Sequence, residues 1–424
     1  MPSLLDTLEQ RGLVHQVTDE KIGQILSAGP VTVYAGFDPT ADSLHLGHLV
    51  PIMVLAHFQQ AGHKVLPMVG GATGMIGDPS FRSEERSLLT AEQVEQNVRG
   101  IGAQLSRFLD FDGENPARLL NNHDWIGRFS FIEWARDVGK YFTINYMLAK
   151  ESVKQRLAGE TGMSFTEFTY MTLQGYDFLH LFEAEGCTFQ VGGSDQWGNI
   201  TAGCDLVRKK HGQTVYAITN PLMTTAAGEK FGKSAGNAIW LDPDRTSPWD
   251  FYQYLIRQDD RDVIRFLNIY TFIDQEEIAE LARAVENEPH KRAAQKRLAF
   301  EVTALVHGRE SAEEMARAAE VVYGSEIKDL TDKTLAAVFA DVPSSELSWA
   351  DLQGGVDLIA FLAENEILPS KGQANRLLKS GGLYINNVRV TDEKPELTGE
   401  HLAGESFIVL RTGKKNYHLV QVKR

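Results

Sequence analysis

The sequence predicts an α/β fold with a parallel sheet in the first half of the chain, followed by a helical region and a small α+β unit. Three observations lead to this fold class. Strand-like apolar runs alternate with helical runs up to about residue 222, glycine-rich turns follow those runs, and glycine becomes scarce over 247–323. Strands that alternate with helices form parallel sheets, whose ligands bind beyond the carboxyl ends of the strands.

The individual elements follow from residue type and spacing. Residues 31–37, VTVYAGF, form a β-rich run that ends at Asp38-Pro39-Thr40, and the apolar stretch 44–58 has helical spacing. Two further strand-like runs, 65–69 and 187–191, each end in a pair of glycines, and a helix is expected over 199–210. This order predicts a Rossmann-like sheet whose glycine-rich loops hold a nucleotide-sized ligand.

Five segments are expected along the chain. Beyond residue 247, apolar residues recur at three- and four-residue spacing within dense charge, which is typical of a helical domain. The stretch 341–355 is rich in Pro, Ser and Gly and is expected to be a linker. The segments are a Rossmann-like domain at 1–222, a mobile loop region at 223–246, the helical domain at 247–340, the linker at 341–355 and a last unit at 356–424.

Composition argues against several classes of protein. No apolar run among the 424 residues approaches the ~20 residues that span a bilayer, so a membrane role is not expected. The N-terminus lacks a basic segment followed by an apolar core, and only Cys187 and Cys204 are present. Both facts favour a cytoplasmic protein without a disulfide framework. Two cysteines are also too few for a cysteine zinc site, so no zinc is expected.

The charge is polarised along the chain. A net charge of −15 argues against a protein coated uniformly with basic residues, as a non-specific nucleic-acid binder would be. From Asp357 onward, however, ten Lys and Arg stand against eight Asp and Glu. This local surplus fits an RNA-binding tail, although a basic tail can equally serve solubility.

Two short motifs carry the chemistry. His45-Leu46-Gly47-His48 stands where the first strand and loop are followed by a helix, so its imidazoles and backbone N–H groups can face a phosphate. Lys230-Phe231-Gly232-Lys233-Ser234 lies far downstream, among small and polar residues that make a mobile loop able to close over phosphate. Taken singly, the motifs also fit a polar surface turn and a solvated loop.

Together, H-x-G-H at the first strand–helix turn and K-x-x-K-S after the α/β domain resemble the paired signatures of class I aminoacyl-tRNA synthetases. The chemistry of that family needs such residues. Attack of an amino-acid carboxylate on the α-phosphate of ATP adds negative charge, which fixed donors and cations stabilise. A side-chain nucleophile or general base is not required, because the carboxylate already carries its charge.

The tyrosyl branch of this family is the one that four further segments resemble: YAGFDPTADSLHLGH (34–48), GGATGMIGDPS (70–80), YMTLQGYD (170–177) and QVGGSDQWGN (190–199). The resemblance runs through essentially the whole chain. It implies that Tyr34 and Asp177 hydrogen-bond the phenol hydroxyl of tyrosine. A pocket built for a hydroxyl rejects phenylalanine because the buried polar groups of the pocket are then unpaired. This enzyme family is itself the known example of such selectivity, with ~10⁵-fold discrimination between tyrosine and phenylalanine.

The resemblance also implies further contacts. The tyrosine set adds Asp78, Tyr170 and Gln174 at the substrate amino group, Asp38 near it, and Gln196 near the carboxylate. The ATP set is Gly36, Asp38, Thr40, His45, His48, Gly193, Asp195, Lys230 and Lys233, with Asp195 near the ribose. Positions 170, 174 and 177 are four and three apart, so they line one face of a helix and can converge on one ligand. Singly, these residues also fit an amphipathic helix, and Asp78-Pro79 fits a turn.

The catalytic set implied by the resemblance comprises Thr40, His45, His48, Lys230 and Lys233, with Arg82 and Arg86 assisting from a loop. Many relatives carry lysine at the position of Arg82, and a planar guanidinium is not equivalent to an ammonium, so the detailed role of Arg82 stays open. The second signature has Phe231-Gly232 where Met-Ser is usual in the class. Phe-Gly is common in the tyrosyl branch.

The last unit resembles an S4-type RNA-binding domain, on the segments SKGQANRLLKSGGLYINNVRV (370–390) and FIVLRTGKKNYHLVQV (407–422). A helix there carries Lys371, Arg376 and Lys379, whose basic face can run along a phosphate backbone and position RNA more than read its sequence. Arg208 and Lys209, at the end of the 199–210 helix, could contact the acceptor stem, although cations also stabilise a helix C-terminus. The helical domain is then expected to bind the anticodon.

The resemblance implies a two-step reaction. Tyrosine and ATP give tyrosyl-adenylate and pyrophosphate, and the tyrosyl group then passes to the 3′ end of tRNA(Tyr). Magnesium is expected to accompany ATP through phosphates and water, since the sequence has no dedicated metal-ligand spacing. A homodimer is expected, and Trp125, Phe129, Phe131 and Trp134 suit either its interface or the core.

Three alternatives stay open. A synthetase for tryptophan shares the fold but does not need the pair Tyr34 and Asp177. A nucleotidyltransferase could adenylate a small acid without RNA, although the S4-like tail argues against it. A non-catalytic RNA-binding protein could retain an inactive synthetase fold, although the intact histidines and lysines of the two signatures argue against that loss.

Overall fold

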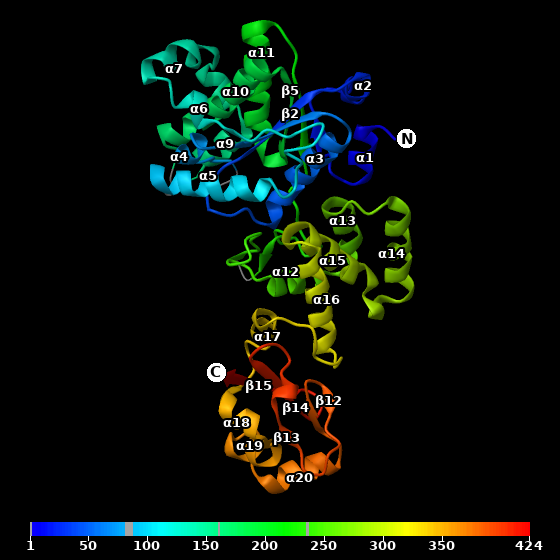
Figure 1. Cartoon of the computed structure of the whole chain (residues 1–424). Helices are drawn as coiled ribbons and strands as arrows, with labels where there is room; N and C mark the ends of the chain where they lie inside the picture. The colour runs from blue at the N-terminus through cyan, green and yellow to red at the C-terminus, as the bar shows by residue number, and fades with distance from the viewer. Residues whose placement is uncertain (1, 81–87, 160–161, 235–236) are drawn as a thin grey trace. The chain divides into compact units, whose positions relative to one another are not determined.

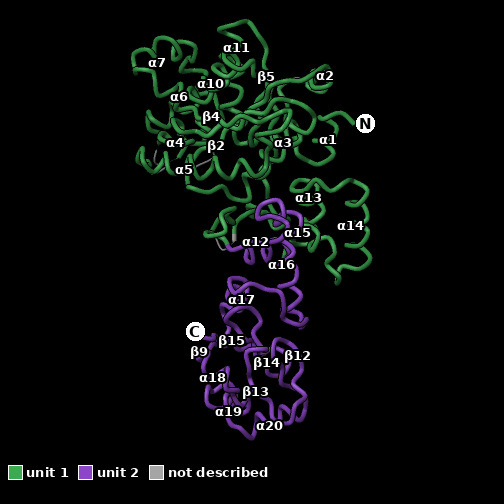
Figure 2. The backbone as a smooth tube through the Cα atoms, viewed as in Figure 1, with its two compact units in different colours: residues 1–246, 257–298 green, residues 247–256, 299–424 purple. Residues whose placement is uncertain are grey.

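The computed structural model describes residues 2–80, 88–159, 162–234 and 237–424 and divides into two compact units (Figures 1 and 2). Unit 1 comprises residues 1–246 and 257–298, and unit 2 comprises residues 247–256 and 299–424. A mostly parallel sheet lies in unit 1, and helices followed by a small α+β sheet lie in unit 2. The predicted fold class is therefore confirmed.

Unit 1 is built on a six-stranded sheet of order β1-β6-β5-β2-β3-β4, in which β1 is antiparallel and the other neighbours are parallel. The strands are β1 (Gln16–Val17), β2 (Thr32–Phe37), β3 (Lys64–Val69), β4 (Leu120–Asn121), β5 (Cys187–Gly193) and β6 (Tyr216–Asn220). The chain adds β3 on one side of β2 and later β5 on the other. The carboxyl ends of β2 and β5 therefore flank the switch point where such sheets bind ligands.

Unit 1 also contains helices, several of which cover this sheet. They are α1 (Leu4–Gln10), α2 (Ile22–Ala28), α3 (Leu49–Gln60), α4 (Thr73–Ile76), α5 (Ala91–Leu105), α6 (His123–Ile126), α7 (Phe131–Asp137), α8 (Ile144–Leu148), α9 (Glu151–Leu157), α10 (Phe165–Glu185), α11 (Trp197–His211), α13 (Asp260–Tyr270) and α14 (Gln275–Asn287). Helix α3 packs on β2, β3 and β5 and also on α1 and α13, which explains why it is apolar nearly all round. The long helices α10 and α11 pack on each other and on β5.

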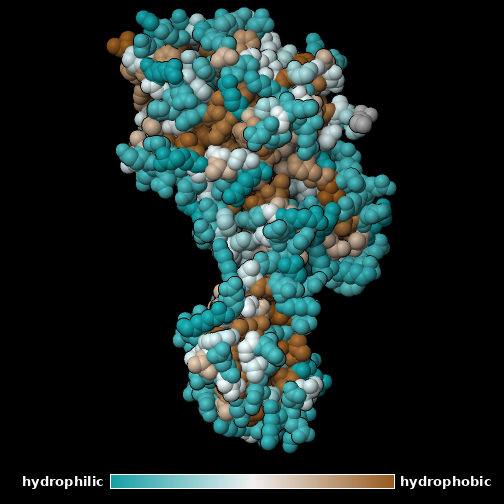
Figure 3. All heavy atoms as spheres, in the orientation of Figure 1, coloured by the Kyte–Doolittle hydropathy of each residue, from teal (hydrophilic) through white to brown (hydrophobic). Residues whose placement is uncertain are grey.

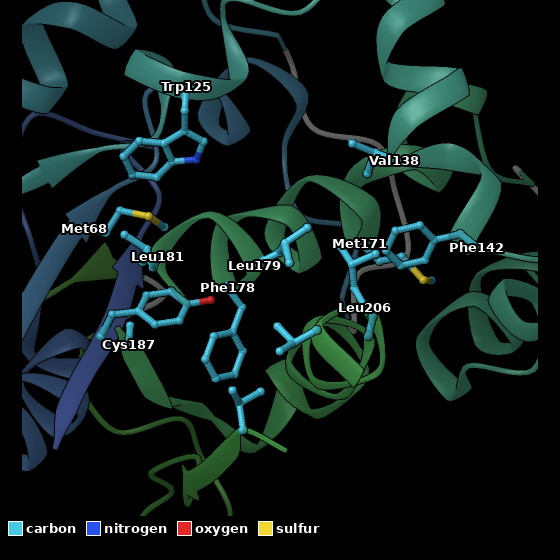
Figure 4. Close-up of a cluster of buried hydrophobic side chains, with 14 of the residues drawn as sticks. Met68, Trp125, Val138, Phe142, Met171, Phe178, Leu179, Leu181, Cys187 and Leu206 are labelled. Carbon is cyan, nitrogen blue, oxygen red and sulfur yellow. The ribbon is translucent and has the colours of Figure 1, made fainter. Parts of the chain in front are cut away.

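One hydrophobic cluster of unit 1 lies between β2, β3 and these two long helices. Figure 4 shows it, with Phe178 and Leu179 from α10 next to Leu206 from α11. Tyr34 of β2 is fully buried in this cluster, and its ring meets the ring of Phe178 edge to face at 5.3 Å. The aromatic packing fixes where the Tyr34 hydroxyl lies, and that hydroxyl is part of the site described below.

Unit 2 joins helices to a five-stranded sheet of order β12-β11-β14-β15-β9. Its helices are α12 (Pro248–Ile256), the part of α15 (Ala293–His307) from residue 299, α16 (Arg309–Val322), α17 (Asp332–Val338), α18 (Trp349–Gly354), α19 (Leu358–Glu364) and α20 (Lys371–Lys379). Its strands are β9 (Ser344–Ser348), β10 (Val356–Asp357), β11 (Leu383–Ile385), β12 (Val388–Arg389), β13 (Glu396–Leu397), β14 (Phe407–Thr412) and β15 (Asn416–Lys423). Strands β10 and β13 form a separate pair.

The stretch 341–355, predicted to be a linker, contains β9 and α18 in the structure. Strand β9 pairs in parallel with β15 along Ser344–Ser348, and Leu347 is buried in the core of unit 2. Its Pro and Ser content is compatible with this place because β9 is an edge strand, with Pro343 just before it. The other domain boundaries stay predictions. None of the helices in the described part of the chain is long and apolar enough to cross a membrane.

Candidate active site

Asp38 marks the centre of the site, where the loop after β2 meets the loop after β3 and helix α10. The hydroxyl of Thr73 donates to its Oδ1 and the hydroxyl of Tyr170 donates to its Oδ2, both at 2.7 Å. Gly70 makes this approach possible, since a Cβ there would lie 2.2 Å from Asp38 Oδ1. Three elements far apart in sequence are thus brought to one carboxylate at the carboxyl edge of the sheet.

The floor of the site is a buried polar network around Asp177. Trp125 Nε1 donates to its Oδ1 at 2.8 Å, and Asn122 Nδ2 donates to its Oδ2 at 3.1 Å. Asn122 also donates to the Thr73 hydroxyl at 3.0 Å and accepts from the backbone N–H of Ala72 at 2.8 Å. The network therefore links the phenol-binding candidate Asp177, through Asn122 and Thr73, to Asp38.

Burial shifts the acid–base properties of this floor. Desolvation raises the pKa of Asp177 to about 8, although the hydrogen bonds from Asn122 and Trp125 favour its ionised form. Desolvation and the neighbouring Asp177 also raise the pKa of the Tyr34 hydroxyl well above its ordinary value. Among the described residues this hydroxyl has no hydrogen-bond partner. A buried hydroxyl without a partner is costly, so a ligand that pairs with it gains that free energy.

The opposite end of the site brings together two carboxylates, those of Asp78 and Asp195. Gln196 Nε2 donates to Asp78 Oδ2 at 2.7 Å and to Asp195 Oδ2 at 3.3 Å, which ties the loop after β5 to the loop after β3. Burial and the nearby charge of Asp78 raise the pKa of Asp195. Together with Asp38, these carboxylates can attract a cation, as recognition of an ammonium group requires. Gln174 is buried one helical turn from Tyr170.

The first signature holds both histidines in one tautomer. His45 Nδ1 accepts from the backbone N–H of Gly47, and His48 Nδ1 accepts from the backbone N–H of His45, each at 3.1 Å. A ring nitrogen that accepts leaves the other nitrogen, Nε2, to carry the proton. Burial, and secondarily Lys233, lowers the pKa of His45 to about 4. The His45 ring is therefore a neutral N–H donor near pH 7, stacked on His48 at 3.9 Å between ring centroids.

The second signature and the segment that follows it both lie against the first. Leu46 N–H donates to the carbonyl of Ile239, and Leu241 N–H donates to the carbonyl of Leu44, both at 2.9 Å. Gly232 has a φ of +83°, and a Cβ there would lie 3.2 Å from Leu46 Cβ, so both conformation and space favour glycine. Phe231 is buried against α13, and the centroid of its ring lies 4.0 Å from the ring centroid of Phe266.

These contacts explain the Phe-Gly pair of the second signature, which stands between its two lysines. Lys230 and Lys233 remain exposed. Lys233 influences the pKa of His45, and Lys230 lowers that of Asp195, so both lysines lie within electrostatic reach of the site. Thr40 is exposed in the loop after β2, and Gly36 and Gly193 lie in β2 and β5 at the carboxyl edge of the sheet.

Three groups of predicted residues remain. Arg82 and Arg86 lie outside the described residues. Arg208 and Lys209 end α11, where Arg208 pairs with Asp205 at 2.6 Å and Lys209 Nζ donates to the carbonyl of Tyr141 at 2.7 Å. In unit 2 the exposed cations Lys371, Arg376 and Lys379 all lie on α20, and Lys371 pairs with Glu364 at 3.3 Å.

Sequence reasoning missed Asn122 as a site residue and left Trp125 open between interface and core. The structure buries Trp125 and gives its indole N–H to Asp177. The available signal was weak, since β4, which precedes Asn122, has only two residues. The polar run Asn121-Asn122-His123-Asp124 is the pattern that would have indicated a third loop at the same edge of the sheet.

Comparisons with known proteins agree with this geometry. The family described as tRNA synthetases class I (W and Y) matches residues 26–324, and the family described as the tyrosine–tRNA ligase SYY-like C-terminal domain matches residues 334–420. The tyrosine–tRNA ligase of Rhodopirellula baltica is 49% identical over 99% of this chain and 97% of its own. That of Geobacillus stearothermophilus is 50% identical over 99% of both chains.

Solved structures give the same result. A C-terminally truncated mitochondrial tyrosyl-tRNA synthetase of Aspergillus nidulans has a TM-score of 0.69 at 33% identity, and the match covers 76% of this chain and 94% of the other. A tryptophanyl-tRNA synthetase of Plasmodium falciparum shares the fold at 14% identity, with a TM-score of 0.53 over 78% and 87% of the two chains. This chain therefore belongs to the tyrosine–tRNA ligase family of class I tRNA synthetases.

Proposed function

We propose that this chain joins tyrosine to tRNA(Tyr) at the expense of ATP, with the Asp38-centred site performing both steps. The observation that carries the proposal is the floor of the site, where the buried Tyr34 hydroxyl has no partner among the described residues and stands within electrostatic reach of the buried Asp177. A phenol hydroxyl fits between a hydroxyl and a carboxyl group, because it can donate one hydrogen bond and accept another. Phenylalanine would leave the floor unpaired.

In this proposal the rest of the tyrosine set holds the other end of the amino acid. Asp78, Tyr170 and Gln174 take the ammonium group, with Asp38 close by, and Gln196 lies near the carboxylate. The hydrogen bonds of Asp78 and Asp38 to Gln196, Thr73 and Tyr170 support these roles because they hold both acids before a substrate arrives. A site that is fixed in advance positions the carboxylate for attack at low entropic cost.

The phosphate chemistry is assigned to the two signatures. The carboxylate of tyrosine attacks the α-phosphorus of ATP, an acyl–phosphate bond forms, and the bond to pyrophosphate breaks. His45 Nε2–H is a neutral donor for the developing charge, His48 acts beside it, and Lys230 and Lys233 approach from the loop. Thr40, Arg82 and Arg86 complete the phosphate set. The nucleoside lies along Gly36, Gly193 and Asp195. The two glycines have no side chain, so the nucleoside can approach their backbone closely, and Asp195 contacts the ribose.

Magnesium is proposed to accompany the phosphates. Across the described ranges, no group of three or more His, Cys, Asp or Glu could hold a metal ion. Magnesium in nucleotide sites is usually bound mainly by phosphate oxygens and water, and it then needs few protein ligands. When bound, it would neutralise charge on the leaving pyrophosphate.

The second step brings in RNA. A ribose hydroxyl at the 3′ end of tRNA(Tyr) attacks the tyrosyl carbonyl and releases AMP. The exposed cations of α20 are proposed to lie along the RNA backbone. Arg208 and Lys209 are proposed to lie near the acceptor stem, and the helical domain is proposed to bind the anticodon. Because Arg208 and Lys209 already have partners in the structure, RNA must replace those contacts, and their net contribution is small.

A homodimer is also proposed. Several large apolar side chains of unit 1 are exposed in the segment that follows α6, and they are Phe131 at 71%, Ile132 at 76%, Ile144 at 60%, Leu157 at 48% and Phe165 at 68%. Hydrophobic atoms protrude at the edge of the view where Figure 1 draws α7, while hydrophilic residues cover most of the surface around them (Figure 3). Exposed apolar residues gathered in one segment are typical of a protein interface. A cytoplasmic location is proposed from the two free thiols, Cys187 and Cys204.

The test is tyrosine-dependent exchange of labelled pyrophosphate into ATP, run beside phenylalanine and tryptophan and followed by charging of bulk tRNA. Exchange with tyrosine alone, followed by charging, is the expected result. Exchange with tryptophan instead would move the chain to the sister activity. Exchange without charging would leave an adenylating enzyme, and no exchange with any amino acid would contradict the proposal.

A further inference from the structure

The second signature begins inside a short hairpin of unit 1, residues 223–231. Phe231 N–H donates to the carbonyl of Met223 at 2.9 Å, and Thr224 and Lys230 pair as an antiparallel bridge. Lys230, the first lysine of the signature, is therefore part of the closing arm of the hairpin. The place that its side chain can reach depends on where the hairpin is held.

The tip of this hairpin is exposed, over residues 226–230. Exposed turns of small and polar residues have little packing to fix them, so they move readily unless specific contacts hold them. One such contact is present, because the backbone N–H of Ala226 donates to Asp262 Oδ2 at 2.7 Å. Asp262 lies in the first turn of α13, 36 residues further along the chain. A carboxylate on α13 thus binds the exposed turn.

Asp262 is a buried acid, with 3% of the residue exposed. Its Oδ1 accepts from Arg265 at 2.9 Å, and the guanidinium of Arg265 also donates to the carbonyl of Thr224 on the hairpin. A carboxylate loses hydration when it is buried, and its hydrogen bonds must offset that cost. Both of these hydrogen bonds lead to the hairpin, the first directly and the second through Arg265.

An aromatic contact adds to this polar one. The ring centroid of Phe231 lies 4.0 Å from that of Phe266 and 5.2 Å from that of Tyr270, both on α13. Asp262, Phe266 and Tyr270 follow one another at intervals of four residues, so they lie on one face of the helix. This face of α13 binds the hairpin at its tip through Asp262 and at its base through Phe231.

Helix α13 is itself fixed to the part of unit 1 that carries the first signature. It packs on α3, which begins at Leu49, directly after His48. Beyond its other end, the Arg11 guanidinium donates to the carbonyls of Thr271 at 2.8 Å and Ile273 at 2.7 Å. The helix therefore relates the position of the hairpin to that of the first signature.

We propose that Asp262 is a positioning residue for the formation of tyrosyl-adenylate, and that it holds the hairpin so that Lys230 meets the phosphates of ATP. This inference rests on the proposed function, which gives Lys230 that role. Burial and Asp78 raise the pKa of Asp195 and Lys230 lowers it, so the held hairpin keeps Lys230 within electrostatic reach of the site. Asp262 does not contact the substrate itself, so its whole effect passes through the hairpin.

Asp262→Ala tests the proposal, with Asp262→Asn as the conservative variant. The alanine variant should slow tyrosine-dependent pyrophosphate exchange by about tenfold to hundredfold, the effect of one lost hydrogen bond to a charged group. The asparagine variant keeps an oxygen for Ala226 N–H and loses only an ion pair to the half-exposed Arg265, so its exchange should fall by about fivefold or less. Equal losses in the two variants would mean that the charge of Asp262, and not its contact with the hairpin, sets the rate, and would overturn the proposal.

Asp259→Ala is the matched control for weakening of the helix itself. Asp259 caps the same helix, because its side chain accepts from Arg261 N–H at 2.9 Å, and its ion pair is also with Arg261. Losing this cap destabilises α13, so chemical denaturation should show lower stability while exchange stays within about twofold of wild type. If Asp259→Ala slowed exchange as much as Asp262→Ala, a weakened α13 would explain the result and the proposal would be wrong.

The Lys230→Ala background tests whether the effect passes through that lysine. Adding Asp262→Ala to Lys230→Ala should slow exchange by no more than about twofold further, because both changes remove the same cation from the phosphates. Transfer of tyrosine from preformed tyrosyl-adenylate to tRNA, a step without pyrophosphate, should be unchanged in Asp262→Ala. Fully additive losses, or a transfer step slowed as much as exchange, would overturn the proposal. A wild-type chain without tyrosine-dependent exchange would contradict the proposed function instead, so the two failures are distinguishable.

Discussion

The two ends of the active site are built in opposite ways. At the floor, Asp177 is fully buried and receives hydrogen bonds from Trp125 and Asn122. At the phosphate end, Lys230 and Lys233 are exposed on a loop, and the histidine between them and the sheet, His45, is a neutral donor. At the floor, the hydrogen bonds of Asp177 are formed before a substrate arrives. At the phosphate end, the exposed lysines have charge that ATP can neutralise when it binds.

The difference follows from what each end must do. Choosing tyrosine over phenylalanine requires polar groups that are costly to leave unpaired, and this is only true where water is excluded. Stabilising a charge that appears during the reaction requires cations that can approach and withdraw with the nucleotide. Changes at the phosphate end should therefore act mainly on rate, and changes at the floor on the choice of amino acid.

Lys233→Ala should give the largest effect. Removing one cation that is proposed to meet the transferring phosphates is expected to slow pyrophosphate exchange by about 10²- to 10³-fold, with KM for tyrosine nearly unchanged. Steady-state exchange assays at varied tyrosine and ATP concentrations measure both quantities. Lys154→Ala, an exposed lysine on α9, is the control. A rate within twofold of wild type would remove Lys233 from the phosphate role.

Asp177→Asn should give the next largest effect, and on a different quantity. The new amide has one NH₂ group and one oxygen, so its NH₂ would face either the NH₂ of Asn122 or the indole N–H of Trp125. In both orientations one buried donor loses its acceptor. A hydrogen bond to a charged or strongly polar group contributes about 1.5–3 kcal/mol. We expect kcat/KM for tyrosine to fall by about 10²-fold, and the preference for tyrosine over phenylalanine to narrow.

The control for Asp177→Asn is Asp124→Asn, an exposed carboxyl next to Trp125 in sequence. Exchange assays with both amino acids decide the outcome. If Asp177→Asn slowed both amino acids equally, the floor would be a structural core element with no part in specificity.

The sequence predicts more of the candidate tyrosine-binding residues than of the residues that support them. Tyr170, Gln174 and Asp177 are spaced as one helical face, and the structure buries all three on α10. Trp125 and Asn122, by contrast, reach Asp177 across 52 and 55 residues of chain, and local periodicity carries no information on such pairs.

The same limit explains the two other differences. Phe231 stands in a loop that reads as solvated, yet it is buried because α13 supplies an aromatic surface far along the chain. The 341–355 stretch has the composition of a linker, yet β9 is a strand because β15, near the end of the chain, offers it a parallel partner. In both segments, contacts with distant parts of the chain determine a structure that differs from the one their local composition predicts.

Gly232→Ala should give an intermediate effect that tests how the two signatures are joined. Alanine at a φ of +83° costs about 1–2 kcal/mol, and its Cβ would press on Leu46. Gly228→Ala is a matched control, because Gly228 in the same loop has a φ of +82° but no atom within 4 Å of the place that an alanine methyl group would take. We expect about tenfold slower exchange for Gly232→Ala only. Equal losses in the two variants would mean that backbone strain, and not docking on the first signature, limits the loop.

Trp125→Phe should give the smallest effect on rate and a clear effect on stability. It removes the N–H that bonds Asp177 Oδ1, which costs about 1–3 kcal/mol in the free energy of unfolding, and it should lower kcat/KM for tyrosine only a few-fold. Chemical denaturation measures the first quantity and exchange assays the second. A loss of activity as large as that of Asp177→Asn would mean that the indole contacts tyrosine itself.

The pH dependence of that stability gives a separate check on the floor. The pKa of Asp177 is about 8 in the folded chain and near 4 when unfolded, so between these values the folded chain binds a proton that the unfolded chain does not. The contribution of Asp177 to the free energy of unfolding must therefore fall as pH rises from about 4 to 8, by at most ~1.4 kcal/mol per pH unit. In Trp125→Phe a donor that favours the ionised form is gone, so the pKa should rise and the fall should continue beyond pH 8. Denaturation series from pH 6 to 9, with Asp177→Asn as the variant that lacks the titrating group, measure the slope. A wild-type slope no different from that of Asp177→Asn would mean that Asp177 is ionised in the folded chain, with the floor a charged acceptor for the phenol and not a neutral one.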